Sequence, residues 1–401
     1  MSSMNASVAT LGDRPLQEND LREHIDPLFS RVLRKGGDSI YLANHSLGRP
    51  LDRTEDDVRE GLGLWYSHLD GAWEGWQAET LGFRQRVAAL IHAAGAHCII
   101  PKASAGQGLR AVLNRRDRPL RVIASRSEFN SIDVILKAYE GRGRIQIDWV
   151  GPDARRLYRP NDFIAALEAR PDLLVLSLVF YDTGQFFADI AAVIDVARAC
   201  GVEILLDLYH AAGALPVDVG ALDVDYAVGG CYKYLRGGPG AAWLYVHPRR
   251  LDEEPRTLDT GWFAVAAPFG FERAGATRFA QGGDGWLEST PAILPFYQAR
   301  AGLEFALVIG VERLRAYCLT QQSLFLAELS KHRVACFAPE QPRGAFVAIP
   351  HSGAASIVDR LGAEGIIADA REGFLRFCPD ILNSSRELCE AARRIAGVVR
   401  R

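Results

Sequence analysis

A lysine between two tyrosines, followed by a glycine-rich turn, is the feature of this sequence whose residue types and spacing best suit covalent chemistry. The segment runs from Cys231 to Gly240, with Lys233 near its start, and it follows an apolar, strand-like run. Asp207 and His210 follow another apolar run earlier in the chain. Because ligands bind at the carboxyl ends of the strands in open α/β sheets, we expect these side chains to line one edge of a sheet.

This set of side chains suits pyridoxal 5′-phosphate (PLP), a cofactor whose aldehyde forms a Schiff base with a lysine amine. A carboxylate beside the pyridine nitrogen keeps the ring protonated, so that the ring can accept the electrons of a carbanion. Burial among aromatic side chains lowers the pKa of a lysine, which frees its amine to act as nucleophile and base. We therefore predict that Lys233 carries the cofactor and that Asp207 contacts its ring nitrogen.

Each of the two residues also has a purely structural explanation. Asp207 could cap the end of a strand, and Lys233 could be a surface lysine whose methylene groups cover apolar side chains. Either explanation accounts for one residue alone. The pair, with each member at the end of an apolar run and the lysine beside a glycine-rich turn, favours the cofactor site.

The overall composition favours a partner of low molecular weight. The 401 residues are 48% hydrophobic and carry a formal net charge of −3, so the chain can bury a large core, and its length suggests two domains. Acidic and basic residues are interspersed, which argues against binding to nucleic acids or anionic membranes. The start of the chain lacks the features of a secretory signal, and no apolar run could span a bilayer. We expect a cytoplasmic protein.

The sequence contains seven cysteines, and no two of them form a C-x-x-C pair. Their odd number and wide spacing indicate free thiols in a reducing compartment, and they argue against disulfides or a zinc site. We therefore expect no bound metal.

The middle of the chain alternates apolar strand-like runs with amphipathic helix-like segments, which is typical of an α/β fold with a mostly parallel sheet. Several runs are apolar on both faces, as buried parallel strands must be. The predicted strands are Arg121–Ala124, Ile145–Val150, Leu173–Phe180, Glu203–Asp207, Tyr226–Val228 and Ala242–Val246. The clearest helix between them covers Asp189–Cys200, with Gly201 as its C-terminal stop.

From Pro291 onward the pattern changes to long helices over Ala292–Ile309 and Val311–Lys331, short strand-like pieces, and a final helix over Ser385–Arg400. This change predicts a second, smaller α+β domain. We expect a large cofactor-binding domain over residues 51–290 and a small domain made of residues 1–50 and 291–401.

The segments around Asp207 and Lys233 resemble those of the kynureninases, which belong to the class V aminotransferase group of fold type I PLP enzymes. The longest matches are DLYHAAGALPVDV from Asp207 and GGCYKYLRGGPGAAWLYV from Gly229. Shorter ones are YLANHSLGRP, FYDTGQ, TGWF, STPAIL and LRFCP. The resemblance implies the fold type I PLP-dependent transferase fold, an L-amino acid substrate, and a homodimer whose active sites lie at the interface.

The resemblance also implies cofactor contacts beside Asp207 and Lys233. Ser104 and Ala105 match a phosphate loop before a helix start, where free N–H groups and the helix dipole favour an anion. Phe129 matches the aromatic residue that stacks on the cofactor ring. Trp262 and Thr290 match positions that reach the phosphate from the neighbouring subunit.

Further roles implied by the resemblance concern the phosphate and the substrate. His210 and Tyr232 are expected near the phosphate, and Tyr232 is also the expected proton shuttle. Arg376 matches the arginine that grips the substrate carboxylate, a task for which its planar fork is suited. Asn44 and Trp73 are the other expected substrate contacts.

Three departures from the kynureninase pattern are present. Where kynureninases carry a Gly-His pair that recognises the aromatic substrate, this chain reads DGAWEGW from Asp70 to Trp76. The usual Phe-Pro-Ser-Asp is replaced by the segment from Phe129 to Asp133, which displaces the aspartate by one position. An insertion, Gly283–Glu288, precedes the segment that contains Thr290. We expect cofactor binding to be intact and substrate choice to be altered.

The leading hypothesis is a kynureninase-like hydrolase of amino acid metabolism. Such an enzyme cleaves the Cβ–Cγ bond of an L-amino acid that has a γ-carbonyl. The products are L-alanine and a carboxylic acid, which is anthranilate if the substrate is the L-kynurenine of tryptophan catabolism.

Other functions would use the same cofactor residues. An aminotransferase, a racemase or a C–S lyase needs Lys233 and Asp207 equally. A cysteine desulfurase normally needs a mobile cysteine shortly before the carboxylate-binding arginine, and Ile366–Arg376 contains none, since Cys378 comes after it. The alternative of another class is a protein that keeps this fold but only binds PLP or a partner, and the intact Lys233 speaks against it.

Overall fold

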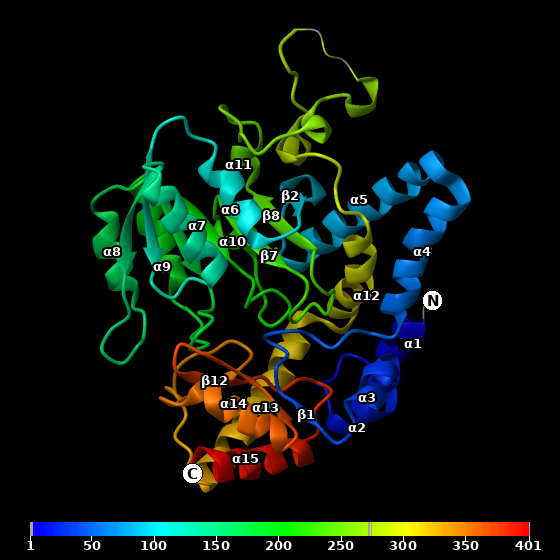
Figure 1. The fold of residues 1–401 in the computed structure, drawn as a ribbon, viewed down its shortest axis with the longest axis vertical. Helices are drawn as coiled ribbons and strands as arrows, with labels where there is room; N and C mark the ends of the chain where they lie inside the picture. Colours follow the sequence, from blue (N-terminus) through cyan, green and yellow to red (C-terminus); the bar gives the residue numbers. More distant parts are fainter. Residues whose placement is uncertain (1–2, 272, 274, 401) are drawn as a thin grey trace.

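A seven-stranded, mostly parallel sheet forms the centre of the fold (Figure 1). The computed structural model describes residues 3–271, 273 and 275–400. In order along the sheet the strands are β2 (Ile99–Lys102), β8 (Ala242–Val246), β7 (Tyr226–Gly230), β6 (Glu203–Asp207), β5 (Leu173–Ser177), β3 (Leu120–Ser125) and β4 (Ile145–Val150). All neighbours from β7 to β4 are parallel, whereas β8 runs antiparallel to both β7 and β2.

Burial of the central strands explains their apolar sequences. Every residue of β5, β6, β7 and β8 is buried, so the side chains on both faces must be apolar or satisfied inside the protein. The predicted strands are confirmed, except that the expected Leu173–Phe180 ends already at Ser177. The sequence does not predict β2, because Pro101 and Lys102 interrupt its apolar pattern.

The strand order creates a topological switch point beside β3. The chain passes from β3 to β4 on one side and returns on the other side of β3 as β5. Ligands bind outside the carboxyl ends of the strands at such a point. Ser125, Ser177 and Asp207 are the last residues of β3, β5 and β6, so the candidate aspartate lies one strand away from the switch point.

Helices pack against this sheet and against one another (Figure 1). Those that contact its strands or each other are α4 (Arg53–His68), α5 (Ala72–Leu90), α6 (Ala105–Leu113), α7 (Asn130–Gly141), α8 (Pro160–Leu167), α9 (Ile190–Ala199) and α12 (Leu294–Ile309). The predicted helix over Asp189–Cys200 is confirmed as α9. None of the described helices is long and apolar enough to cross a membrane.

The C-terminal elements form a second group below the large sheet in Figure 1. They are α13 (Val311–Lys331), α14 (Ala354–Ala363), α15 (Ser385–Val399) and an antiparallel sheet of β11 (Asp369–Arg371), β12 (Phe374–Phe377) and β9 (Val347–Pro350). Near the start of the chain, β1 (Ile40–Tyr41) pairs with β10 (Ile366–Ile367). Residues of this group share a buried apolar cluster of their own, as the predicted small domain requires, while the domain boundaries stay a prediction.

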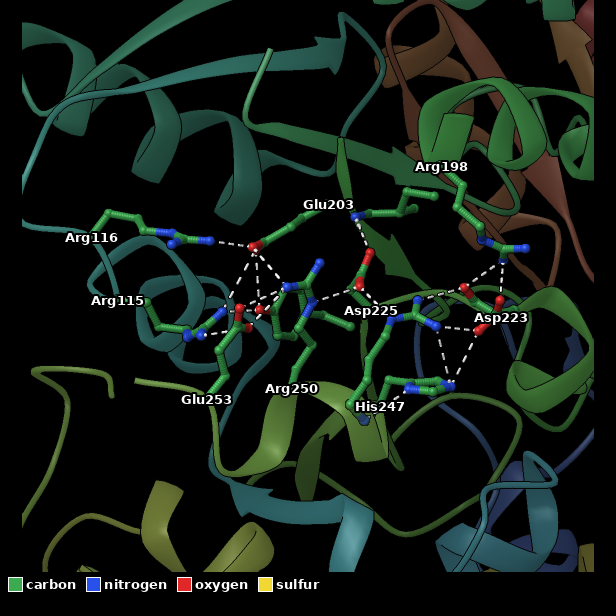
Figure 2. A network of polar contacts seen from close by, with 12 residues as sticks. Arg115, Arg116, Arg198, Glu203, Asp223, Asp225, His247, Arg250 and Glu253 are labelled. Atoms are coloured by element: carbon green, nitrogen blue, oxygen red, sulfur yellow. Dashed lines mark hydrogen bonds and ion pairs between the residues drawn. The ribbon is translucent and has the colours of Figure 1, made fainter. Parts of the chain in front are cut away.

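Charged side chains form a continuous network at the amino-terminal edge of the parallel strands (Figure 2). Glu203 begins β6, and Asp225 directly precedes β7. Nε of Arg250 donates to Oδ1 of Asp225 over 2.9 Å, and its Nη1 lies 3.6 Å from Oε1 of Glu203. The buried Arg115 joins through Glu253, at 3.0 Å. Because these acids and bases neutralise one another, the opposite, carboxyl-terminal edge is better suited to bind a ligand.

Candidate functional site

Lys233 is buried at the carboxyl-terminal edge of the sheet, just beyond β7. Its amine Nζ lies 2.6 Å from Nε2 of His210, whose Nδ1 lies 3.2 Å from the Tyr234 hydroxyl. The same amine lies 5.4 Å from the ring centre of Phe129 and 5.7 Å from that of Tyr232. The structure thus brings His210, Phe129 and Tyr232 together around the lysine, while their expected contacts with the cofactor stay predictions.

Burial controls the protonation of this cluster. It lowers the pKa of Lys233 to about 7, although the negative charge of Asp207 acts in the opposite direction. Burial and the nearby charge of Lys233 hold the pKa of His210 well below its ordinary value. The neutral imidazole accepts a hydrogen bond from the amine at Nε2 and donates one to Tyr234 from Nδ1. A lysine amine that is neutral near pH 7 is a nucleophile.

Asp207 is buried at the end of β6, at the same edge. Its Oδ1 accepts a hydrogen bond from the backbone N–H of Tyr209 over 2.7 Å. Burial raises the pKa of Asp207, while that hydrogen bond and the charge of Lys233 lower it. A buried carboxylate needs a cationic partner, and the protonated ring nitrogen of PLP is such a partner, so the residues present fit the cofactor.

A second buried acid, Glu128, joins the strands on both sides of the switch point. Its Oε1 accepts a hydrogen bond from Oγ of Ser125, and its Oε2 accepts one from Oγ of Ser177, both over 2.6 Å. Burial raises the pKa of Glu128 to about 7. Phe129 follows directly, so Glu128 fixes the turn from which the ring of Phe129 enters the site. Sequence reasoning missed Glu128, because nothing in its neighbours marks it as buried.

Ser104 and Ala105 lie between β2 and α6. Ser104 is the N-cap of the helix, and its Oγ accepts a hydrogen bond from the N–H of Gln107 over 3.3 Å. The other N–H groups of a first helical turn have no helical partner, and they favour an anion. This geometry suits the predicted phosphate loop, while the phosphate contact itself stays a prediction.

Trp262 and Thr290 meet in the segment that leads to α12, where Nε1 of Trp262 donates to Oγ1 of Thr290 over 3.2 Å. The predicted insertion anchors this segment: Trp286 is fully buried, and Oε1 of Glu288 accepts a hydrogen bond from Nζ of Lys102 over 2.5 Å. Trp262 is half-buried and Thr290 is exposed. Their predicted contact with a neighbouring subunit is not tested by a single chain.

Trp73, on α5, belongs to an aromatic cluster. Its ring centre lies 5.4 Å from that of Trp76, and 6.1 Å from those of Phe263 and Phe269. The cluster borders a cavity of about 580 Å³, which Thr290 also lines. A smaller pocket of about 50 Å³ lies beside Lys233. The two share no lining residue, so one chain alone does not bring Trp73 into the pocket at the lysine.

Asn44 lines the small pocket together with Lys233. Its Nδ2 donates to the carbonyl of Cys378 over 3.2 Å. Its Oδ1 is buried without a partner among the described residues, so it is available to a ligand or a water molecule. The predicted substrate contact of Asn44 stays a prediction.

Arg376, on β12, is buried, and its guanidinium is already engaged. Nε donates to Oδ1 of Asp369 over 2.8 Å, Nη2 donates to Oδ2 of the same carboxylate, and Nη1 donates to the carbonyl of Tyr181. Oδ1 of Asp369 also lies 2.7 Å from Nε2 of His45. Sequence reasoning named Arg376 but missed Asp369 and His45.

A signal for Asp369 is present in the sequence. Glu372 and Gly373 both have positive φ angles, as in the two-residue turns that favour glycine and close a β-hairpin. The hairpin register places Asp369 directly opposite Arg376. A hairpin predicted at this Glu-Gly pair would therefore have found the carboxylate that holds the arginine.

Two observations concern metals and thiols. All seven cysteines are free, as the sequence predicts. Within the described ranges, no group of three or more His, Cys, Asp or Glu side chains could hold a metal ion.

The chain resembles a known protein family and a known enzyme over most of its length. The profile of the family described as Aminotransferase class-V matches residues 73–373. A kynureninase of Pseudomonas fluorescens is 29% identical over 376 residues, which cover 88% of this chain and 86% of that protein.

Solved structures of the protein C-DES share the fold. A C-DES mutant with glycine covalently linked to the PLP cofactor has a TM-score of 0.83 and 20% sequence identity, and it covers 92% of this chain and 98% of its own. The cystine C–S lyase C-DES in complex with its product cysteine persulfide has a TM-score of 0.81 and 21% identity, with coverages of 90% and 98%. The predicted fold type I PLP-dependent transferase fold is confirmed.

Proposed function

The chain belongs to the aminotransferase class-V family, and from this premise we propose that it is a PLP-dependent enzyme acting on an L-amino acid. The observation that carries the proposal is the buried Lys233, whose amine lies 2.6 Å from His210 at the sheet edge that also holds Asp207. When bound there, PLP supplies an electron sink for a carbanion.

Lys233 and the residues around it have different roles in this proposal. The amine of Lys233 binds the cofactor and moves the α-proton of the substrate. The carboxylate of Asp207 keeps the ring nitrogen protonated, and Phe129 covers the ring. The first turn of α6, with Ser104 and Ala105, holds the phosphate.

We propose kynureninase-like hydrolysis as the reaction, with support from the 29% identity to a kynureninase over most of both chains. Water adds to the γ-carbonyl of the substrate, the Cβ–Cγ bond breaks, and the γ-carbon leaves in a carboxylic acid. Cβ takes up a proton and L-alanine is formed. Burial raises the pKa of Tyr232, so its hydroxyl stays protonated and can supply that proton.

A C–S lyase reaction is the second candidate, because the cystine C–S lyase C-DES has the same fold. The absence of cysteine from Ile366–Arg376 disfavours persulfide chemistry on a mobile thiol. A lyase that needs no cysteine of its own remains compatible with Lys233 and Asp207.

We further propose a homodimer with the active sites at its interface. In one chain, Thr290 and Trp73 border a cavity that shares no residue with the pocket at Lys233. Large apolar side chains that line that cavity are exposed, including Leu81 and Phe269. A second copy of the chain would cover them and would bring Trp262 and Thr290 to the phosphate.

The test is a panel of L-amino acids incubated with the PLP-loaded protein, with L-alanine, keto acids and sulfide measured separately. L-Alanine from an amino acid with a γ-carbonyl supports the hydrolase, and sulfide from cystine supports the lyase. A PLP-loaded protein that releases none of the three would indicate a binding protein. The Lys233→Ala variant serves as the blank.

A further inference from the structure

The hydrogen bonds of Arg376 leave only part of its guanidinium for a substrate. A guanidinium has five N–H donors. Two of them go to Asp369, from Nε and Nη2, and one on Nη1 goes to the carbonyl of Tyr181. One N–H on Nη1 and one on Nη2 are left. A substrate carboxylate can therefore bind only through the two Nη groups, because Asp369 occupies the Nε side.

Asp369 is itself held by a third element of the chain. Its Oδ1 accepts a hydrogen bond from Nε2 of His45, which follows β1. The exposed fractions of the side chains are 0% for His45, 14% for Asp369 and 4% for Arg376, so water competes little for these bonds.

The protonation states of His45 and Asp369 follow from their burial and from their hydrogen bonds. Burial lowers the pKa of His45 to about 4, so the imidazole is neutral. Burial raises the pKa of Asp369, but the hydrogen bonds from His45 and Arg376 hold it below its ordinary value. A neutral imidazole thus donates to a carboxylate that is paired with a guanidinium, and the group as a whole is neutral before a substrate arrives.

The fully buried ring of Phe346 connects this group with the lysine site. Its centre lies 4.9 Å from the ring of His45 and 5.7 Å from that of His210, and Cζ of Arg376 lies 5.4 Å above it. His210 is the residue that meets the amine of Lys233. The guanidinium is therefore one packed ring away from the lysine cluster.

We propose that Asp369 and His45 are positioning residues that direct the two free Nη N–H groups of Arg376 at the carboxylate of the substrate. This inference rests on the proposed function, because it takes Arg376 to be the residue that binds that carboxylate. A long arginine side chain without a fixed partner would have to be ordered at each binding event, which weakens binding. A guanidinium fixed in advance favours a planar carboxylate over a neutral amide.

The test compares two probes, L-alanine and L-alaninamide, which differ in the carboxylate. Their dissociation constants from the PLP-loaded protein follow from the change in cofactor absorbance. In the Asp369→Asn variant an NH₂ group replaces one acceptor oxygen and opposes the N–H groups of Arg376. We expect the preference for L-alanine over L-alaninamide to fall by about tenfold.

Arg371→Gln is the matched control. Nη2 of Arg371 lies 3.8 Å from Oδ2 of Asp369, on the exposed side of that carboxylate. The change removes a charge near Asp369 without touching Arg376, so the preference should stay within about twofold. An unchanged preference in Asp369→Asn would overturn the proposal. An increased preference would also overturn it, since it would show that Asp369 opposes the substrate carboxylate.

His45 provides a second test that does not depend on Asp369→Asn folding. His45→Leu removes the hydrogen bond to Asp369 and should lower the preference by about threefold, while His45→Gln keeps an N–H group and should restore it. Equal preferences in the two variants would contradict a positioning role.

Arg376→Ala separates this inference from the proposed function. If this variant keeps the preference for L-alanine, the carboxylate role of Arg376 is wrong. If the preference is lost in Arg376→Ala but kept in Asp369→Asn, only the positioning role is wrong.

Discussion

Nζ of Lys233 lies 2.6 Å from Nε2 of His210, and both side chains are buried. Because burial and the nearby charge of Lys233 hold the pKa of His210 well below its ordinary value, the imidazole takes no proton from the lysine and only accepts its hydrogen bond. Burial also lowers the pKa of Lys233 to about 7. The amine is therefore held in a fixed direction, and a large fraction of it is neutral near pH 7.

The first prediction is a pH dependence for covalent capture of PLP by the cofactor-free protein. Below pH 7 the ammonium form of Lys233 is not nucleophilic, and above it the amine is free. The capture rate, followed by stopped-flow absorbance, should rise about tenfold from pH 6 to pH 8 and then level off. The reaction rate of free Nα-acetyl-lysine with PLP should instead keep rising up to pH 10, because its amine has a pKa of about 10.4. If the rate of PLP capture by the protein also keeps rising up to pH 10, the prediction is wrong.

The second prediction is that Lys233→Ala abolishes covalent attachment of PLP, whereas Lys102→Ala does not. Lys102 is also buried, but its amine is bound to Glu288 over 2.5 Å and to the carbonyl of Trp286 over 3.3 Å. Its ammonium is thus occupied by an ion pair. Borohydride reduction and peptide mapping should find the pyridoxyl group on the peptide with Lys233. A pyridoxyl group on Lys102 would show that Lys233 is not the residue that carries the cofactor.

The fate of particular residues shows what the sequence could predict. Asp207 and Lys233 could be placed together, because each follows a buried strand and the strand ends share one edge. The contact of His45 with Asp369 could not, since 324 residues separate them. Periodicity reports which face of an element is buried, but it does not report which distant side chain meets that face.

The third prediction is that Asp207→Asn costs more activity than cofactor affinity. The change removes the charge that keeps the ring nitrogen protonated, while the phosphate contacts remain. We expect the rate on the preferred substrate to fall by about 100-fold or more, and the affinity for PLP to change by less than about tenfold. Asp225→Asn, at the opposite edge and equally buried, is the control for the loss of a buried charge. It should change the catalytic rate and the affinity for PLP by similar factors. Equal activity of Asp207→Asn and the parent would reject the electron-sink role.

The fourth prediction is that Trp262→Ala weakens PLP retention in a homodimer. The indole lies beside Thr290, with a hydrogen bond of 3.2 Å, and we expect this pair to reach the phosphate of the second subunit. PLP should dissociate about tenfold faster from the variant. Leu258→Ala, an exposed side chain of the same segment, should dissociate at the parent rate. Sedimentation should show a dimer, and a stable, fully active monomer would overturn this prediction.

The last prediction concerns substrate choice, and it starts from the surroundings of Trp73. Its ring packs against Trp76 and Phe263. The described residues that line the adjacent cavity include no histidine. The indole and phenyl rings of this cluster offer apolar contact where the Gly-His pair of kynureninases would offer a polar partner, and a missing polar contact costs discrimination.

We therefore expect weak activity on L-kynurenine and 3-hydroxykynurenine, and better activity on another L-amino acid whose tail is apolar. The measurement is kcat/KM for both kynurenines beside a panel of L-amino acids. Trp73→Ala should lower kcat/KM for the preferred substrate by about tenfold, because it removes a large apolar contact. Trp65→Ala, at the exposed end of the cluster, should leave it within about twofold. A value of about 10⁴ M⁻¹s⁻¹ or above for either kynurenine, within the ordinary range of enzymes, would show that the departures around Trp73 are without consequence and that this chain has the specificity of a kynureninase.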